Sequence, residues 1–140
     1  PEVKGLYFPG ITKEDAERDL GDSAVVETMG LGGFASVRSP GFMLALGSTF
    51  ADAVRQTKEM GEITAAKNHH FSIPWLDFEG APTGIDIRKV LETGIAPKIS
   101  TGIFLKNPKK GIGAGFGISE APIECFRKAF LAFAKKHGLE

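Results

Sequence analysis

The chain is short and electrically neutral, and both properties narrow the classes of protein to which it can belong. Its 140 residues suffice for one ordinary domain, and 42% of them are hydrophobic, so a core can form. The 17 Lys and Arg residues balance 17 Asp and Glu residues. This balance removes the electrostatic reason to expect nucleic acid or an anionic membrane as a partner. No apolar run approaches the roughly 20 residues that a membrane-spanning helix needs.

The number of cysteines indicates the redox state of the compartment in which the protein is found. Cys125 is the single cysteine, so no disulfide can form within the chain. This indicates a reducing compartment, and we expect a cytoplasmic protein.

The first third of the chain begins without a periodic pattern. The turn signal at Pro9-Gly10 and the polar stretch 12–20 predict an irregular lead-in over residues 1–21. Helical spacing of apolar residues then predicts a helix over 24–37, capped by Asp22 or Ser23. Three glycines in its middle each cost about 0.5 to 1 kcal/mol relative to alanine. They require either close packing against another backbone or the close approach of a ligand.

The middle of the chain reads as helices around a strand. We expect a helical turn over 40–47 and a helix over 50–66, whose capping box pairs Thr49 with Asp52. A strand over 71–78, bent at Pro74, precedes a loop over 80–84. Thr83 is expected to cap a short helix over 85–92, which Gly94 ends.

The clearest β signal is a hairpin near the C-terminus. Alternation over 95–106 and 112–118, around a turn at 107–111, predicts two paired strands. One face of the second strand carries only glycines, so a helix or a ligand must lie close over it. A helix over 120–137, capped by Ser119, follows with a stripe of Phe residues along one face. The chain is therefore predicted to be a single α+β domain over 1–140, with helices packed on a small, mainly antiparallel sheet.

The loop before the short helix is the best anion-site candidate from chemistry alone. A helix N-terminus offers free N–H groups to an anion, and Thr83 and Gly84 open this helix. Arg88 can hold a carboxylate or phosphate in a bidentate grip. Asp86 is expected either to cap the helix or to orient Arg88. The alternative is a capped surface helix with an ion pair of little energetic value.

Two glycine-rich stretches resemble nucleotide-binding loops but lack their defining residues. The run 30–33 has no following Lys-Ser/Thr pair, so it is not a P-loop. Gly32 and Gly33 form either an anion-binding nest or, more simply, a tight helix contact. The run 113–118 ends in Ile118 where a dinucleotide fingerprint needs glycine. We therefore expect structural glycines and no cofactor.

Three residues are candidates for catalysis. His70, next to His69, can carry a proton, although a solvated loop is the simpler interpretation. The adjacent histidines have no third ligand nearby in sequence, so we expect no metal. Asp77 flanks the proposed anion loop. Glu27 stands before the glycine run and is either a buried acid or, more simply, an ordinary acid in the first turn of a helix.

Several separated segments together resemble the YlbE-like family, and they cover nearly the whole chain. The longest are 21–35 (GDSAVVETMGLGGFA) and 76–90 (LDFEGAPTGIDIRKV). Shorter matching segments are 6–10, 92–103, 113–115 and 121–126. Family members are about three times longer, so the resemblance implies that this chain corresponds to their C-terminal part. A histidine-containing turn of the family is replaced here by 104–106.

The resemblance implies a subunit of oxamate carbamoyltransferase, an enzyme of purine (allantoin) degradation. That reaction interconverts oxalurate and phosphate with oxamate and carbamoyl phosphate. Thr101 and Gly102, together with Thr83, Gly84 and Arg88, are groups suited to hold such substrates. The Ser-Thr-Arg-Thr motif of other carbamoyltransferases is absent.

The implied partners are a small anionic substrate, the remainder of a longer chain or other enzyme subunits, and further copies in a homo-oligomer. Two other functions fit the same residues. One is a non-catalytic assembly domain that pairs through the Phe helix and the glycine strand. The other is a module that senses a small anion without turnover.

Overall fold

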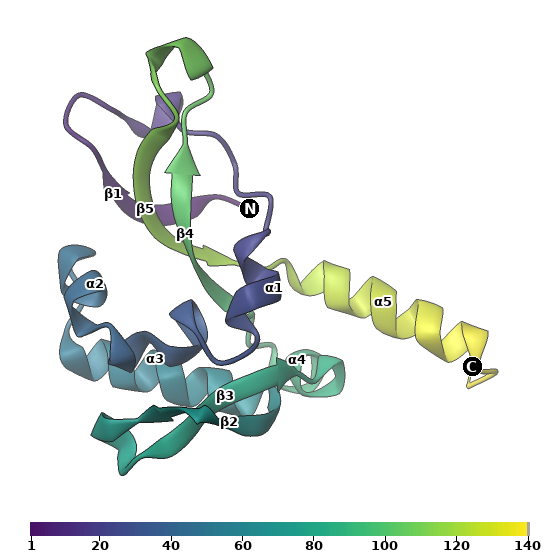
Figure 1. Ribbon diagram of the computed structural model, residues 1–140. Helices are drawn as coiled ribbons and strands as arrows, with labels where there is room; N and C mark the ends of the chain where they lie inside the picture. The colour runs from purple at the N-terminus through teal and green to yellow at the C-terminus, as the bar shows by residue number, and fades with distance from the viewer. Residues whose placement is uncertain (140) are drawn as a thin grey trace.

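The computed structural model describes residues 1–139 and has an α+β fold. A three-stranded antiparallel sheet, in the order β1-β5-β4, stands beside a layer of helices and a two-stranded β2-β3 sheet (Figure 1). The predicted fold class is confirmed. No helix among residues 1–139 combines the length and apolar character needed to cross a membrane.

The three-stranded sheet contains the predicted hairpin. Strand β4 (Lys98–Phe104) pairs antiparallel with β5 (Gly113–Glu120), and a 3-10 turn at Pro108–Lys110 joins them. Strand β1 (Val3–Tyr7) pairs with the other edge of β5. The prediction of an irregular lead-in over 1–21 is therefore wrong for β1. Only Val3 of this strand is buried, so its sequence lacks the alternation that marks a strand.

The glycines of β5 are explained by the close approach of the neighbouring strand β1, where a helix or a ligand over the bare face was expected. A Cβ atom on Gly115 would overlap the carbonyl oxygen of Leu6, and one on Gly117 would overlap that of Lys4. Only glycines allow β1 to approach β5 this closely.

The predicted helix over 24–37 is broken by its glycines. Helix α1 (Ser23–Glu27) ends before Gly30 and Gly32, which have φ angles of +103° and +51°. Residues with side chains rarely adopt such angles, and an α-helix cannot pass through them. After this break the chain forms the 3-10 helix η2 (Gly32–Arg38).

The next two helices follow the prediction closely. Helix α2 spans Pro40–Ala45, and α3 spans Phe50–Glu62 with the expected Thr49–Asp52 capping box. Helix α3 ends four residues before the predicted position 66, because strand β2 begins at Thr64.

The two-stranded sheet was only partly anticipated. Strand β2 (Thr64–Ile73) starts earlier than predicted, and Pro74 opens a 3-10 turn that ends it. The predicted loop over 80–84 is strand β3 (Glu79–Ile85), which pairs with β2 along an irregular register. Its Pro82 is tolerated because a two-stranded sheet consists of edges. Helix α4 (Ile87–Thr93) follows and ends at Gly94, as predicted, but its cap is Asp86 where Thr83 was expected.

The core joins the helices to both sheets. Its largest fully buried side chain is Phe34 of η2, which packs with Met60, Ile63 and Val90 against Ile99 of β4. A second cluster lies under α2 and β2, and a third lies between β1 and β4. Strand β4 is therefore fixed against the helical layer along one side.

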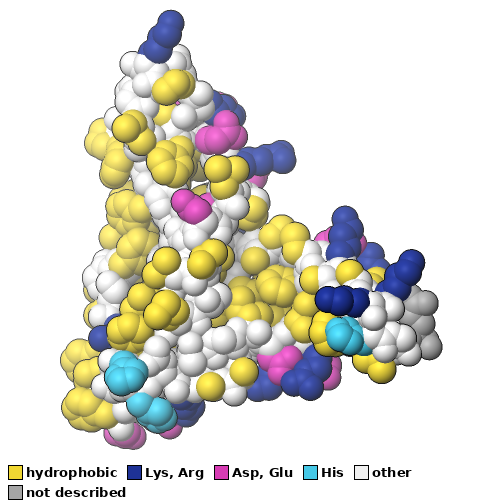
Figure 2. Space-filling model, turned by 45° about the vertical axis from the view of Figure 1, so that its right-hand side comes forward, with side chains coloured by type: hydrophobic (Ala, Val, Ile, Leu, Met, Phe, Trp, Pro, Cys, Tyr) yellow, Lys and Arg dark blue, Asp and Glu magenta, His cyan; other side chains and the backbone are white. Residues whose placement is uncertain are grey.

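The last helix, α5 (Ile123–Lys136), extends away from the body of the molecule (Figure 1). Its cap position is Pro122, and the predicted cap Ser119 lies buried in β5. Within Ile123–Lys136 no residue is buried, so the predicted Phe stripe has little of its own chain to cover it. Figure 2 shows hydrophobic side chains gathered where this arm meets the body.

Candidate functional site

Glu27 is a buried carboxylate that joins three elements. Its Oε2 accepts hydrogen bonds from the backbone N–H groups of Gly33 and Ser100, each at 2.8 Å. The Ser100 hydroxyl donates to Oε1. Burial raises the pKa of Glu27, and these hydrogen bonds oppose the rise. Glu27 is therefore a buried acid, where an ordinary helix acid was the simpler expectation, and its carboxylate ties α1 and η2 to β4.

The glycines beside Glu27 are explained by close packing. A Cβ atom on Gly32 would overlap the Glu27 carboxylate, and one on Gly33 would overlap the carbonyl oxygen of Lys98. The N–H of Gly33 is already donated to Glu27. This arrangement favours the tight contact over an anion-binding nest.

Thr83 and Gly84 also use their donors within the chain. The Thr83 hydroxyl and the Gly84 N–H both donate to the carbonyl oxygen of Thr28, at 2.9 and 2.8 Å. These two bonds fasten β3 to the turn that follows α1. Neither group is therefore free to receive an anion in this conformation.

Asp86 and Arg88 form the pair that the sequence predicted. Asp86 caps α4 by accepting from the N–H of Arg88 at 3.0 Å. Its two oxygens accept from Nε and Nη2 of Arg88 at 3.0 and 2.7 Å. The Arg88 guanidinium lowers the pKa of Asp86 to about 2. Arg88 itself is 70% exposed, so solvent reaches its guanidinium.

The remaining predicted residues do not join a single site. Thr101 is buried on β4, and its hydroxyl lies 3.4 Å from Asp19 Oδ1, while Gly102 is exposed. His70 and Asp77 are exposed on the β2-β3 hairpin, where Asp77 closes a turn with φ of +50°. Within residues 1–139, no group of three or more His, Cys, Asp or Glu side chains is placed to hold a metal ion.

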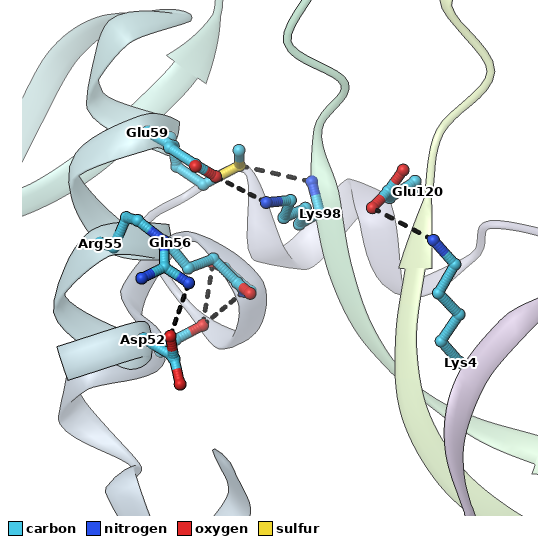
Figure 3. A network of polar contacts seen from close by, with 10 residues as sticks. Lys4, Asp52, Arg55, Gln56, Glu59, Lys98 and Glu120 are labelled. Atoms are coloured by element: carbon cyan, nitrogen blue, oxygen red, sulfur yellow. Dashed lines mark hydrogen bonds and ion pairs between the residues drawn. The ribbon is translucent and has the colours of Figure 1, made fainter. Parts of the chain in front are cut away.

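The structure reveals a polar cleft that the sequence analysis missed. It lies between α3 and the three-stranded sheet and consists of two adjoining cavities of about 300 and 310 Å³ (Figure 3). Four residues line both cavities: Met43, Ser48, Gln56 and Lys98. Charged residues complete the polar cleft, namely Asp52, Arg55 and Glu59 from α3, and Lys4 and Glu120 from the sheet.

Ion pairs organise the charges of this polar cleft. Lys98 Nζ lies 2.5 Å from Glu59 Oε2, and both side chains are less than one third exposed. Arg55 pairs with Asp52 at 2.5 Å. Lys4 and Glu120 lie 3.9 Å apart at the other rim. With the two pairs at α3, the polar cleft contains three cations and three carboxylates.

Gln56 adds a fixed hydrogen-bond acceptor. Its Nε2 donates to the Gly33 carbonyl oxygen at 3.1 Å and to Ser36 Oγ at 2.6 Å. A carbonyl oxygen can only accept, so the amide orientation is determined. The hydrogen bonds among residues 1–139 give Oε1 of Gln56 no donor, and this oxygen is not among the buried unpartnered atoms, so it reaches solvent although the residue is only 8% exposed.

The polar cleft left one signal in the sequence. Asp52, Arg55, Gln56 and Glu59 follow the spacing of a single helix face. That spacing alone is equally compatible with a helix face that points to solvent. The missing information was Lys98, which only the tertiary fold places opposite that face.

The α+β fold of this chain also occurs as part of a longer protein of solved structure. No protein-family model matches the chain. The chain is 44% identical over 97% of its length to "Oxamate carbamoyltransferase subunit AllG" of Escherichia coli K12. It is 40% identical over 99% of its length to "Uncharacterized protein YahG" of the same organism. Neither relative carries the YlbE-like name.

A solved structure supports the same fold. A conserved protein of unknown function from Enterococcus faecalis V583 matches 96% of the chain with a TM-score of 0.88 and 47% sequence identity. The chain spans only about a third of each of these proteins, namely 32% of AllG, 29% of YahG and 32% of the solved chain.

Proposed function

We propose that this chain is part of a carbamoyltransferase subunit that acts on oxamate. The observation that carries the proposal is the 44% identity to the oxamate carbamoyltransferase subunit AllG, which extends over 97% of the chain. Identity at this level over nearly the whole chain supports a shared role for this region.

The proposed reaction places clear demands on the binding groups. The oxamate nitrogen attacks the carbonyl carbon of carbamoyl phosphate, a C–N bond forms, and the C–O bond to phosphate breaks. The nitrogen loses a proton and the products are oxalurate and phosphate, a conversion that we place in purine (allantoin) degradation. The enzyme must hold a carboxylate and a phosphate and stabilise the oxyanion at the carbonyl. The polar cleft supports the proposal because it offers fixed cations beside amide and hydroxyl groups.

Arg88 keeps a place in this proposal as a surface grip for an anionic substrate group. Its guanidinium is exposed, and an incoming carboxylate can compete with Asp86 for it. We expect Arg88→Ala in the intact enzyme to raise KM for the anionic substrate by more than about twofold, since a charge-assisted hydrogen bond is lost. A change in KM of less than about twofold would contradict this role of Arg88.

A thermal-shift titration of the intact protein tests whether it binds the proposed substrates. The ligands are oxamate, carbamoyl phosphate, oxalurate and phosphate, with sulfate as the control. A ligand that binds only the native state stabilises it by about 2.7 kcal/mol at a hundredfold excess over Kd. We expect shifts with oxamate or carbamoyl phosphate and none with sulfate. Equal shifts with all anions, or none at all, would contradict the proposal.

A second candidate function is assembly with another enzyme subunit, and α5 is the observation that favours it. Its side chains Phe130, Leu131 and Phe133 are 37%, 53% and 58% exposed. Phe130 and Phe133 line an apolar groove of about 480 Å³ together with Ile87 and Arg88 of α4. The name of the AllG relative describes a subunit. The two functions are compatible within one enzyme.

A further inference from the structure

We propose that the polar cleft binds a small molecule that carries both an anionic group and a carbamoyl (–CO–NH2) group. The anionic group would contact Lys98 and Arg55, and the carbamoyl nitrogen would donate to Oε1 of Gln56. This inference rests on the proposed function and adds a location and a ligand class to it.

Lys98 is held in place before any ligand arrives. Its backbone N–H lies 3.3 Å from Met60 Sδ, and its carbonyl oxygen fills the space left by Gly33. The side chain is 25% exposed, so its ammonium group is partly removed from water while still reachable. A cation whose backbone is fixed and whose hydration is reduced binds an anion more strongly than a free surface lysine.

The acceptor on Gln56 sets the requirement for a carbamoyl group. Sulfate and oxalate carry no hydrogen-bond donor at neutral pH, whereas a carbamoyl nitrogen carries two N–H groups that can donate to Oε1. Oε1 is held at a fixed position because Nε2 of Gln56 is already hydrogen-bonded, so a ligand N–H group that meets it gains a hydrogen bond without ordering the side chain. Oε1 therefore favours an amide-bearing anion over an anion of equal charge that lacks the amide.

The carboxylates of the polar cleft also favour a ligand with an amide group over a simple dianion. Asp52, Glu59 and Glu120 repel a simple dianion that enters between them. They accept hydrogen bonds from an amide nitrogen, so they tolerate a ligand with donors at one end and negative charge at the other. Equal numbers of cations and carboxylates suit such a ligand better than inorganic phosphate. Each cavity is at the lower end of the range for small-molecule sites, which fits a ligand of a few heavy atoms.

Isothermal titration of the intact protein tests this assignment with a pair of related ligands. Oxamate carries a carboxylate and a carbamoyl group, while oxalate replaces the carbamoyl group with a second carboxylate. We expect oxamate to bind at least about tenfold more tightly than oxalate, and Lys98→Met to weaken oxamate binding by about tenfold or more. Glu59→Gln, which frees Lys98 without changing the shape of the side chain, is expected to tighten binding.

The matched control is Lys67→Met. Lys67 also pairs with a glutamate, Glu79, at 2.5 Å, but on the β2-β3 sheet outside the polar cleft. The Lys67→Met variant should bind oxamate with a Kd within about twofold of the wild-type value. Circular dichroism and the thermal midpoint of each variant establish that it is folded.

The outcomes separate this inference from the proposed function. If wild-type protein binds oxamate and Lys98→Met binds it equally well, the polar cleft is not the site and the proposed function stands. If oxalate binds as tightly as oxamate, the role assigned to Gln56 is wrong. If the intact wild-type protein binds neither, the proposed function and this inference are both contradicted.

Discussion

At the scale of single residues, Glu27 connects segments of the chain that are 73 positions apart. Replacing it with leucine would leave the buried N–H groups of Gly33 and Ser100 without an acceptor. Each unsatisfied group costs about 1 to 3 kcal/mol, so we expect Glu27→Leu to lower the free energy of unfolding by about 2 to 4 kcal/mol. Urea denaturation measures this loss. Glu62→Leu, at an exposed position, is the control and should change little.

The raised pKa of Glu27 also predicts a dependence of stability on pH. Its ordinary value is 4.5, and burial raises the pKa in the folded state, so the native protein binds the proton more strongly than the unfolded chain. This contribution favours folding below pH 4.5 and is lost as the pH rises through the folded-state pKa. We expect Glu27→Gln to remove it. Unfolding curves measured from pH 4 to pH 8 should show the variant gaining stability relative to the wild type, and parallel curves would contradict the buried acid.

The close packing at Gly33 makes a prediction of its own. An added methyl group would overlap the Lys98 carbonyl oxygen, so Gly33→Ala should destabilise the fold by about 1 to 3 kcal/mol. Gly41→Ala is the matched control, because nothing lies within 4 Å of its Cβ position and it sits in helix α2. We expect the control to be neutral or stabilising by up to about 1 kcal/mol. Equal effects in chemical denaturation would contradict the contact between η2 and β4.

At the scale of elements, the capping box of α3 fixes the start of the helix that carries the polar cleft. The Thr49 hydroxyl accepts from the N–H of Asp52 at 3.1 Å, and the Asp52 carboxylate accepts from the N–H of Thr49 at 2.8 Å. Thr49→Ala should lower the free energy of unfolding by about 1 kcal/mol. The comparison is Ser39→Ala at the start of α2, where the side chain makes no capping hydrogen bond, so little change is expected. Thermal unfolding of both variants decides between these outcomes.

Elements with local signals were predictable from the sequence, and elements defined by distant contacts were not. The alternation of apolar residues predicted the β4-β5 hairpin, and the capping box predicted the start of α3. Strand β1 has no such pattern because it depends on the glycines of β5. The break after α1 arises from the left-handed glycines at 30 and 32, which the sequence marked as unusual without showing their φ angles.

In the candidate site, too, contacts within one element were predictable and contacts between distant segments were not. The Asp86–Arg88 pair is local and was predicted, although Thr83 was expected to cap α4 and Asp86 does so. The contact between Gln56 and the loop at Gly33, and that between Lys98 and Glu59, join elements that the sequence separates. Spacing rules describe one element at a time, so they cannot show which faces will meet.

At the scale of the whole molecule, the exposed Phe side chains of α5 predict a contact with another enzyme subunit. We expect Phe133→Asp in the intact protein to weaken subunit association by at least about tenfold, because apolar surface is lost and a charge would be buried. The thermal midpoint of the isolated protein should not fall, since Phe133 is 58% exposed. Analytical ultracentrifugation with the partner subunits measures the association.

The control for this surface is Phe78→Asp. Phe78 is 69% exposed and lies in the turn before β3, away from α5 in the fold (Figure 1). Its replacement should leave association unchanged. Equal weakening by both variants would point to a general loss of solubility, and no weakening by Phe133→Asp would exclude α5 as the contact.

The most direct test of the central claim follows the carbamoyl group itself. The intact protein and its partner subunits are mixed with oxamate and carbamoyl phosphate labelled with ¹³C at the carbonyl, and both ¹³C and ³¹P spectra are recorded. We expect the label to move into oxalurate while an equal amount of phosphate is released, faster than in buffer, and we expect Lys98→Met to slow this transfer. Carbamoyl phosphate that decays only at its rate in buffer, with no labelled oxalurate, would contradict the proposed function.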